Sequence, residues 1–359
     1  MNLPLSDSLS TQRLSRIFDK TVATYKYYWF LSILDLHVKH GRTRINVWEI
    51  MVDMVAYAWF PVTYFRLSFG KSESLYQAIW NLQEQYRIPI NLNVSELEKC
   101  LSDLLNDSGV RKQLNFLQVN VPYRFLRPWI DTSDDREMLQ RSQSFENGCL
   151  YKLERVDGSL WVEFNPSWSD YLTQNYCILR DFTYWNLTMF LQVRNPNVPN
   201  IPNKLVRCEN RSSLSRQRDF WNTVIQNTHQ VHCIYTDRLL EVNDYDLDHF
   251  IPWSFVSHDL LWNLMPADPR INCSKNNRLP SLDEYLPKLA LAHREALVVY
   301  LQSGKKGKIL EDYLSVGCTA DAIVAMDTEH LLDCFRKTFV PLNQIAINMG
   351  FESWHYGEH

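Results

Sequence analysis

The spacing of apolar side chains predicts a mostly helical first half of the chain. Apolar residues recur every three or four positions, which is typical of a helix with one buried face. This pattern occurs at residues 12–40, 46–58, 72–86 and 94–105. Asn46 is a candidate N-cap, and Pro61 is expected to interrupt or end the second helix. Ser95 and Glu98 have the spacing of a capping box.

Strict alternation of apolar and polar residues predicts one β-hairpin. Residues 150–155 and 159–164 alternate, and Asp157-Gly158 between them is a strong turn signal. An aromatic-rich helix is expected at residues 168–193. The segment 195–202 contains three prolines, which stop helices and stiffen the backbone, so it is expected to be a linker.

The segment that follows predicts a basic connecting helix at residues 204–226. Further helices are expected at residues 289–301 and 320–339. The fold class we predict is α+β, with short strands inside a mostly helical chain. The expected organisation is an aromatic-rich N-terminal domain for recognition or partner binding, the connecting helix, a catalytic module and a C-terminal helical segment, at residues 1–200, 201–226, 227–285 and 286–359.

Length and composition indicate how many cores the chain can form and whether it has membrane segments or zinc sites. With 359 residues, of which 45% are hydrophobic, the chain is long enough for two or three cores. The most apolar stretch, residues 27–38, is shorter than the roughly 20 residues that a membrane span needs, and the N-terminus has no signal-peptide pattern. None of the eight cysteines forms a C-x-x-C pair, which predicts free thiols and no structural zinc. We therefore expect a cytoplasmic protein without a membrane segment.

The most informative chemistry lies between residues 245 and 277. His249 follows Asp248 directly, Asn263 comes 14 residues after His249, and Asn272 comes nine residues later. Lys275 lies one helical turn beyond Asn272. The pattern around them predicts a strand, a returning strand and a helix, which would bring these side chains around one point.

Each of these residues suits one task in phosphodiester hydrolysis. Asp248 and Asn272 offer hard oxygen ligands for Mg²⁺ or Mn²⁺, and the open positions would be left to water and phosphate. His249 is the candidate general base, because its ordinary pKa lies near neutral pH. Asn263 is expected to fix the loop that holds His249. Lys275 is expected to contact a phosphate or the developing negative charge.

The order and spacing of these residues resemble the HNH (His-Me finger, ββα-metal) endonucleases. The separations are similar to those in the HNH domain of CRISPR-guided effector nucleases, and the resemblance covers residues 231–282. It implies a ββα-metal module, one divalent metal and cleavage of a DNA strand. Thr236 stands where many members have the second cysteine of a zinc pair, which also argues against a structural zinc.

Two nearby features have plain structural explanations. The His258-Asp259 pair is expected to lie in a surface loop or at a cap, because aspartate is a common turn residue. A basic run before the module could follow a DNA backbone, although a solvated helix face explains such a run as well. Its members are Lys204, Arg207, Arg211, Arg216 and Arg218.

The net charge of −4 limits how the protein could bind nucleic acid. Many proteins that bind DNA without sequence preference are basic, so contact with nucleic acid requires a local patch or a partner protein that recruits or activates the enzyme. By analogy, we expect an effector of bacterial anti-phage defence or restriction. The alternatives are an RNase or strand-nicking subunit of a larger nucleoprotein complex, or a non-catalytic subunit for nucleic-acid binding or assembly.

Overall fold

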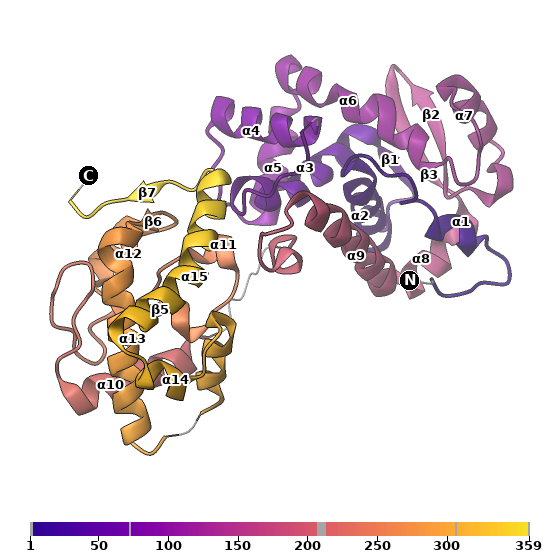
Figure 1. Cartoon of the computed structure of the whole chain (residues 1–359). Coiled ribbons are helices and arrows are strands. Elements are labelled where there is room, and N and C mark those ends of the chain that lie inside the picture. Colours follow the sequence, from indigo (N-terminus) through magenta and orange to yellow (C-terminus); the bar gives the residue numbers. More distant parts are fainter. Residues whose placement is uncertain (1–2, 72, 207–212, 306, 358–359) are drawn as a thin grey trace. The chain divides into compact units, whose positions relative to one another are not determined.

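The computed structural model describes residues 3–71, 73–206, 213–305 and 307–357. Clustering of its contacts divides the chain into two compact units (Figure 1). Unit 1 comprises Met1–Pro196 and Ile201–Arg207, and unit 2 comprises Asn197–Asn200 and Cys208–His359. Within the described residues, no helix combines the length and the apolar character needed to cross a membrane.

Unit 1 consists of helices around a small sheet. Its described helices are α1 (Thr11–Ser15), α2 (Tyr25–Val38), α3 (Val47–Thr63), α4 (Ser74–Tyr86), α5 (Val94–Leu104), α6 (Ser108–Phe125), α7 (Asp135–Ser142), α8 (Ser169–Gln174), α9 (Tyr176–Arg194) and the short 3-10 turns η1 (Glu146–Gly148), η2 (Pro166–Trp168) and η3 (Ile201–Lys204). Most of α2 is buried because it is apolar on nearly every face, and it packs against α3 and α9. Tyr27, Tyr28, Trp29 and Phe30 of this helix are all buried in the core of unit 1.

The predicted hairpin is present in unit 1 and has an additional strand. β2 (Tyr151–Val156) and β3 (Ser159–Phe164) pair antiparallel, and β1 (Arg44–Asn46) pairs with the other edge of β3. Asp157 and Gly158 both have positive φ, at 49° and 79°, which suits the tight turn of a two-residue hairpin. β1 was not predicted, because a strand of three residues is too short to show the alternation of apolar and polar residues that identifies a strand.

Several predicted helix boundaries differ from the structure. Segment 12–40 is divided into α1 and α2, and segment 168–193 is divided into α8 and α9 at Asn175. Asn46 caps α3 as expected, accepting a hydrogen bond from the backbone of Trp48 at 2.9 Å. Pro61 lies inside α3 and does not end it, because the surrounding residues are buried and packing outweighs one lost hydrogen bond.

The capping box before α5 lies two residues earlier than predicted. Asn93 accepts a hydrogen bond from the backbone of Glu96 at 2.8 Å, and Glu96 accepts one from the backbone of Asn93 at 3.1 Å. Asparagine caps a helix as well as serine does, so the alternative start was available in the sequence.

Unit 2 surrounds two pairs of very short strands with helices. Its described elements are α10 (Ser215–Thr228), β4 (Asp246–His249), α11 (Trp253–Val256), η4 (Leu261–Asn263), β5 (Leu264–Ala267), α12 (Pro269–Lys275), β6 (Leu279–Pro280), α13 (Leu282–Gln302), η5 (Lys308–Val316), α14 (Ala320–Ala325), α15 (Thr328–Asn348) and β7 (Ser353–Trp354). β4 and β5 are antiparallel, and β6 and β7 are parallel. The predicted connecting helix begins at Ser215 and not at residue 204.

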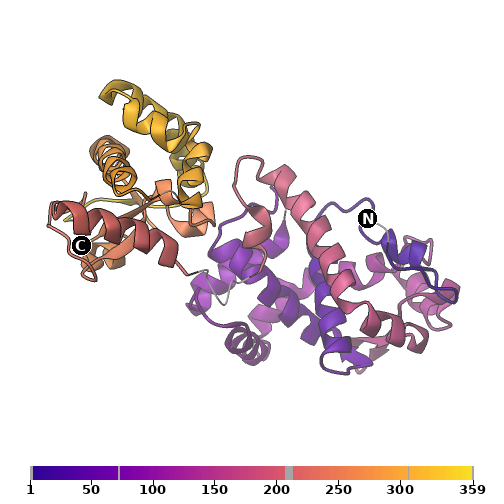
Figure 2. The ribbon, with the colours of Figure 1, turned by 90° about the horizontal axis from the view of Figure 1, so that it is seen from below.

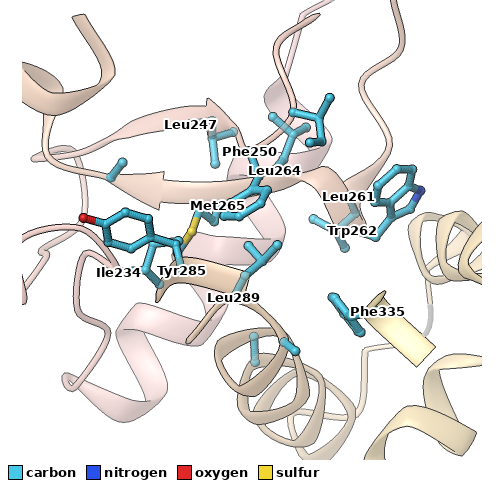
Figure 3. Packing of buried hydrophobic residues seen from close by; sticks show 14 of the residues in the cluster. Ile234, Leu247, Phe250, Leu261, Trp262, Leu264, Met265, Tyr285, Leu289 and Phe335 are labelled. Carbon is cyan, nitrogen blue, oxygen red and sulfur yellow. The ribbon is translucent and has the colours of Figure 1, made fainter. Parts of the chain in front are cut away.

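One hydrophobic core connects the strands of unit 2 to its C-terminal helices. Met265 of β5 lies near Tyr285 and Leu289 of α13, as Figure 3 shows, and Leu247 of β4 and Phe335 of α15 belong to the same cluster. α13 and α15 also pack against each other, and Figure 2 shows the orange and yellow C-terminal helices of unit 2. The described core extends from Phe220 to Trp354, so strands of only four residues have support on the core side.

A histidine in this core makes the stability of unit 2 depend on pH. His293 of α13 is fully buried, its Nδ1 lies 2.7 Å from the hydroxyl of Tyr313, and its Nε2 is buried without a hydrogen-bond partner. Burial lowers the pKa of His293 to about 3. Because the unfolded histidine has a pKa of about 6.5, the unfolded state takes up the proton first as the pH falls. The stability that neutral His293 gives is present above that value and is lost as the pH falls toward 3.

We predict that unit 2 loses about 2 kcal/mol of stability from this group between pH 7 and pH 5. Hydrogen exchange of the α13 amides measures the opening of unit 2. His293→Phe should remove this part of the pH dependence, whereas His355→Phe, at an exposed position, should keep it. An identical pH dependence in wild type and His293→Phe would contradict the prediction.

Candidate active site

The predicted site residues lie on three adjoining elements of unit 2. In the antiparallel pair, Asp248 of β4 is opposite Met265, and His249 is opposite Leu264. α12 follows β5 after a turn and packs against β4. Asp268 begins α12 by accepting a hydrogen bond from the backbone of Arg270 at 3.0 Å, which fixes where the helix starts.

A buried ion pair connects β4 to α12. The Lys275 ammonium group lies 2.9 Å from Asp248 Oδ1 and donates a second hydrogen bond to the carbonyl oxygen of His249 at 2.7 Å. Asp248 Oδ2 accepts a hydrogen bond from the Tyr235 hydroxyl at 2.8 Å. Burial, reinforced by the charge of Asp248, raises the pKa of Tyr235 well above its usual range, so this hydroxyl remains a donor. Each charge is therefore compensated, as a buried pair requires.

The position of Lys275 changes the role expected from the sequence. Its side chain has no exposed surface, and its ammonium group is bound within the site. It therefore cannot reach a phosphate in this conformation. We reinterpret it as the residue that holds Asp248 and the backbone of His249 against α12.

His249 has an acidic partner that the sequence analysis placed elsewhere. Its Nε2 lies 2.9 Å from Asp259 Oδ1, and both side chains are largely buried, with 11% and 20% of their surfaces exposed. Asp259 was expected only in a surface loop or at a cap, beside His258. The contact forms because the chain between α11 and η4 returns to the end of β4, where His249 lies.

Asn263 connects the two ends of this loop through paired hydrogen bonds. Its side-chain oxygen accepts from the backbone of Ile251 at 2.9 Å, and its amide nitrogen donates to the Ile251 carbonyl at 2.8 Å. Its own carbonyl accepts from the backbone of Phe250 at 2.8 Å. Asn263 is fully buried, so these bonds satisfy polar groups that have no access to water. The segment directly after His249 is held rigidly as a result.

Asn272 contacts a carboxylate that the sequence analysis did not single out. Its amide nitrogen lies 3.3 Å from Asp246 Oδ2, and both residues are partly exposed. Asp246 precedes Asp248 by two positions on β4, and alternate residues of a strand point to the same face. The two-residue spacing from Asp248 could therefore have identified Asp246 as a further candidate ligand.

The side chains near this place that carry oxygen atoms are Asp246 and Asp248 of β4 and Asn272 of α12. Within the described residues there is no group of three or more histidine, cysteine, aspartate or glutamate side chains that could hold a metal ion. A cation here would therefore need the neutral amide oxygen of Asn272 and water as ligands, which is a set that suits Mg²⁺ or Mn²⁺.

The described members of the predicted basic run do not share one helix, since Lys204 lies on η3 and Arg216 and Arg218 lie on α10. Lys204 ends η3 in unit 1 and is fully buried, and burial lowers its pKa to about 7. In unit 2, Arg216 is exposed on α10, while Arg218 donates to the carbonyl oxygen of Tyr245 and lies over its ring. Arg207 and Arg211 lie outside the described residues. Because its side chain is buried, Lys204 is not available to contact a nucleic-acid backbone in this structure, contrary to the expectation for the whole run.

The buried ion pair gives a stability prediction. Lys275→Met leaves the Asp248 carboxylate buried without its cation, and we expect the free energy of unfolding to fall by about 3–5 kcal/mol. Lys337→Met is the matched control, because the pair of Lys337 with Asp333 is mostly exposed and should matter little. Chemical denaturation followed by circular dichroism gives both values, and equal losses in the two variants would contradict the prediction.

Comparison with known proteins agrees with the position of this site. Residues 233–281 match the family model described as HNH endonuclease, and this stretch contains β4, β5 and α12. Searches of curated proteins and of solved structures gave no match. The family match lies in the C-terminal half of an α+β chain, within unit 2. The chain therefore contains a domain of the HNH endonuclease family.

Proposed function

We propose that this protein is a divalent-metal-dependent endonuclease that hydrolyses phosphodiester bonds in DNA, with His249 as the general base. The observation that carries the proposal is that the family match covers β4, β5 and α12, which pack against one another and hold Asp248, His249 and Asn272. In this proposal, β4, β5 and α12 form the ββα-metal arrangement of the family.

The metal proposed here would be Mg²⁺ or Mn²⁺ held by Asp248 and Asn272, and we add Asp246 to the set. Both oxygens of Asp248 already accept one hydrogen bond, but a carboxylate oxygen has a further lone pair. Asp246 forms no ion pair with any described residue, so its charge is free to attract a cation. The hydrogen bond of 3.3 Å from the Asn272 amide nitrogen to Asp246 Oδ2 places the two side chains next to each other.

The chemistry of the chain's own residues follows from these positions. A bound divalent cation would neutralise phosphate charge and stabilise the leaving oxygen. His249 would remove a proton from the attacking water, since a neutral imidazole accepts a proton at one ring nitrogen. Asn263 keeps the backbone after His249 in place, and Lys275 holds the same backbone from the side of α12. Exposed Arg216 on α10 is the member of the basic run that we propose contacts nucleic acid.

Replacement of the proposed base gives the main test. We expect His249→Ala to lower the rate of Mg²⁺-dependent plasmid cleavage by about 100- to 10,000-fold, because proton removal from water would no longer be assisted. His355→Ala, at an exposed position, is the control and should cleave as the wild type does. Chelator should abolish cleavage by the wild type.

The same assay distinguishes substrates. A labelled RNA and a single-stranded DNA of the same sequence are included beside the plasmid. Cleavage of RNA alone would replace the proposed DNA substrate, and full activity of His249→Ala would exclude His249 as the base.

Metal binding can be measured without any nucleic acid. Asn272→Ala and Asp246→Ala should each weaken Mn²⁺ binding by about tenfold or more, because each removes one oxygen ligand from a small set. Asn227→Ala is the control, since Asn227 is an exposed asparagine on α10 that bonds within its own helix. Isothermal titration calorimetry gives the affinities, and unchanged Mn²⁺ binding in both variants would place the metal elsewhere.

A further inference from the structure

Asp259 is held in place by contacts that do not involve His249. Its carbonyl oxygen accepts a hydrogen bond from the side chain of Gln217 on α10 at 2.7 Å. Two residues later, the backbone of Leu261 donates to the Asp312 carboxylate at 2.8 Å. The loop is therefore attached to α10 on one side and to η5 on the other. These contacts hold the backbone that carries Asp259 independently of His249.

The neighbouring histidine, His258, has contacts of its own within the loop. His258 Nδ1 accepts from the backbone of Leu260 at 3.4 Å, and its ring lies against Trp262 at 5.4 Å between centroids. Asp259 contacts His249, which lies ten residues earlier in the chain.

The geometry determines which nitrogen of His249 can act as a base. An ionised carboxylate only accepts hydrogen bonds, so a neutral His249 that faces Asp259 carries its hydrogen on Nε2. The lone pair that remains is then on Nδ1. Within the described part of the chain, no residue forms a hydrogen bond to Nδ1, and the His249 side chain keeps 11% of its surface exposed.

We propose that Asp259 is a positioning residue that fixes His249 in the Nε2–H tautomer, so that Nδ1 takes the proton from the attacking water. This role rests on the function proposed above. The O–H bond of the water breaks as its proton moves to Nδ1, and the oxygen forms a bond to phosphorus. The P–O bond to the 3′ oxygen breaks, and that oxygen takes a proton from solvent. The imidazolium formed is stabilised by its hydrogen bond to the Asp259 carboxylate.

A structural role for Asp259 alone would not alter the tautomer of His249, so the test includes a spectroscopic measurement. Two-bond ¹H–¹⁵N correlation of the ¹⁵N-histidine-labelled full chain should show His249 as the Nε2–H tautomer in the wild type. In Asp259→Asn, whose amide group can donate a hydrogen bond to Nε2, we expect this tautomer to be lost. The control is Asp321→Asn, an exposed aspartate on α14, which should leave the spectrum unchanged.

Cleavage kinetics provide the second measurement. Asp259→Asn should lower kcat by about 100- to 10,000-fold while KM changes less than threefold, because the substrate is bound but the base is in the wrong tautomer. Asp259→Glu should recover part of kcat, and Asp321→Asn should keep all of it. Thermal unfolding of each variant tests whether the fold is retained.

The two hypotheses fail in different ways. The positioning role is overturned if wild-type His249 is the Nδ1–H tautomer, or if Asp259→Asn keeps both the tautomer and kcat of the wild type. The proposed function is overturned if the wild type cuts no nucleic acid with added metal. In that case the tautomer measurement still decides whether Asp259 controls His249.

Discussion

The buried pair of Asp248 and Lys275 is the interaction on which the geometry of the site depends. Burying two charges is costly unless each is compensated, and here Tyr235 and the His249 carbonyl complete the set. The same ammonium group that neutralises Asp248 also holds the backbone of His249. One lysine therefore fixes the spacing between β4 and α12, and with it the positions of the proposed metal ligand and the proposed base.

This arrangement requires support from the rest of unit 2. Strands of four residues are too short to be stable by themselves, and β4 and β5 have α13 and α15 behind them in one core. On the other side, Asn263 ties the chain after His249 to the start of β5. The C-terminal helices are thus part of what keeps the site in shape, although they contribute none of the residues proposed for chemistry.

Local patterns predicted those elements whose residues interact mainly with near neighbours. The hairpin turn at Asp157-Gly158 and the N-cap Asn46 were both predicted, because backbone conformation and capping depend on a few adjacent residues. Helix ends were less accurate. Pro61 stays within α3 because burial outweighs its local preference, and the capping box of α5 begins at Asn93.

The sequence by itself determined the order and spacing of Asp248, His249, Asn263 and Asn272, and these identified the family to which residues 233–281 belong. Only the tertiary structure decided that Lys275 is buried and that Asp259 contacts His249. The reason is that both contacts join segments brought together by the packing of α12 and of the loop before η4. Spacing along a chain shows which residues can share a helix or strand face, but the choice of partner for a charge depends on which buried groups need compensation.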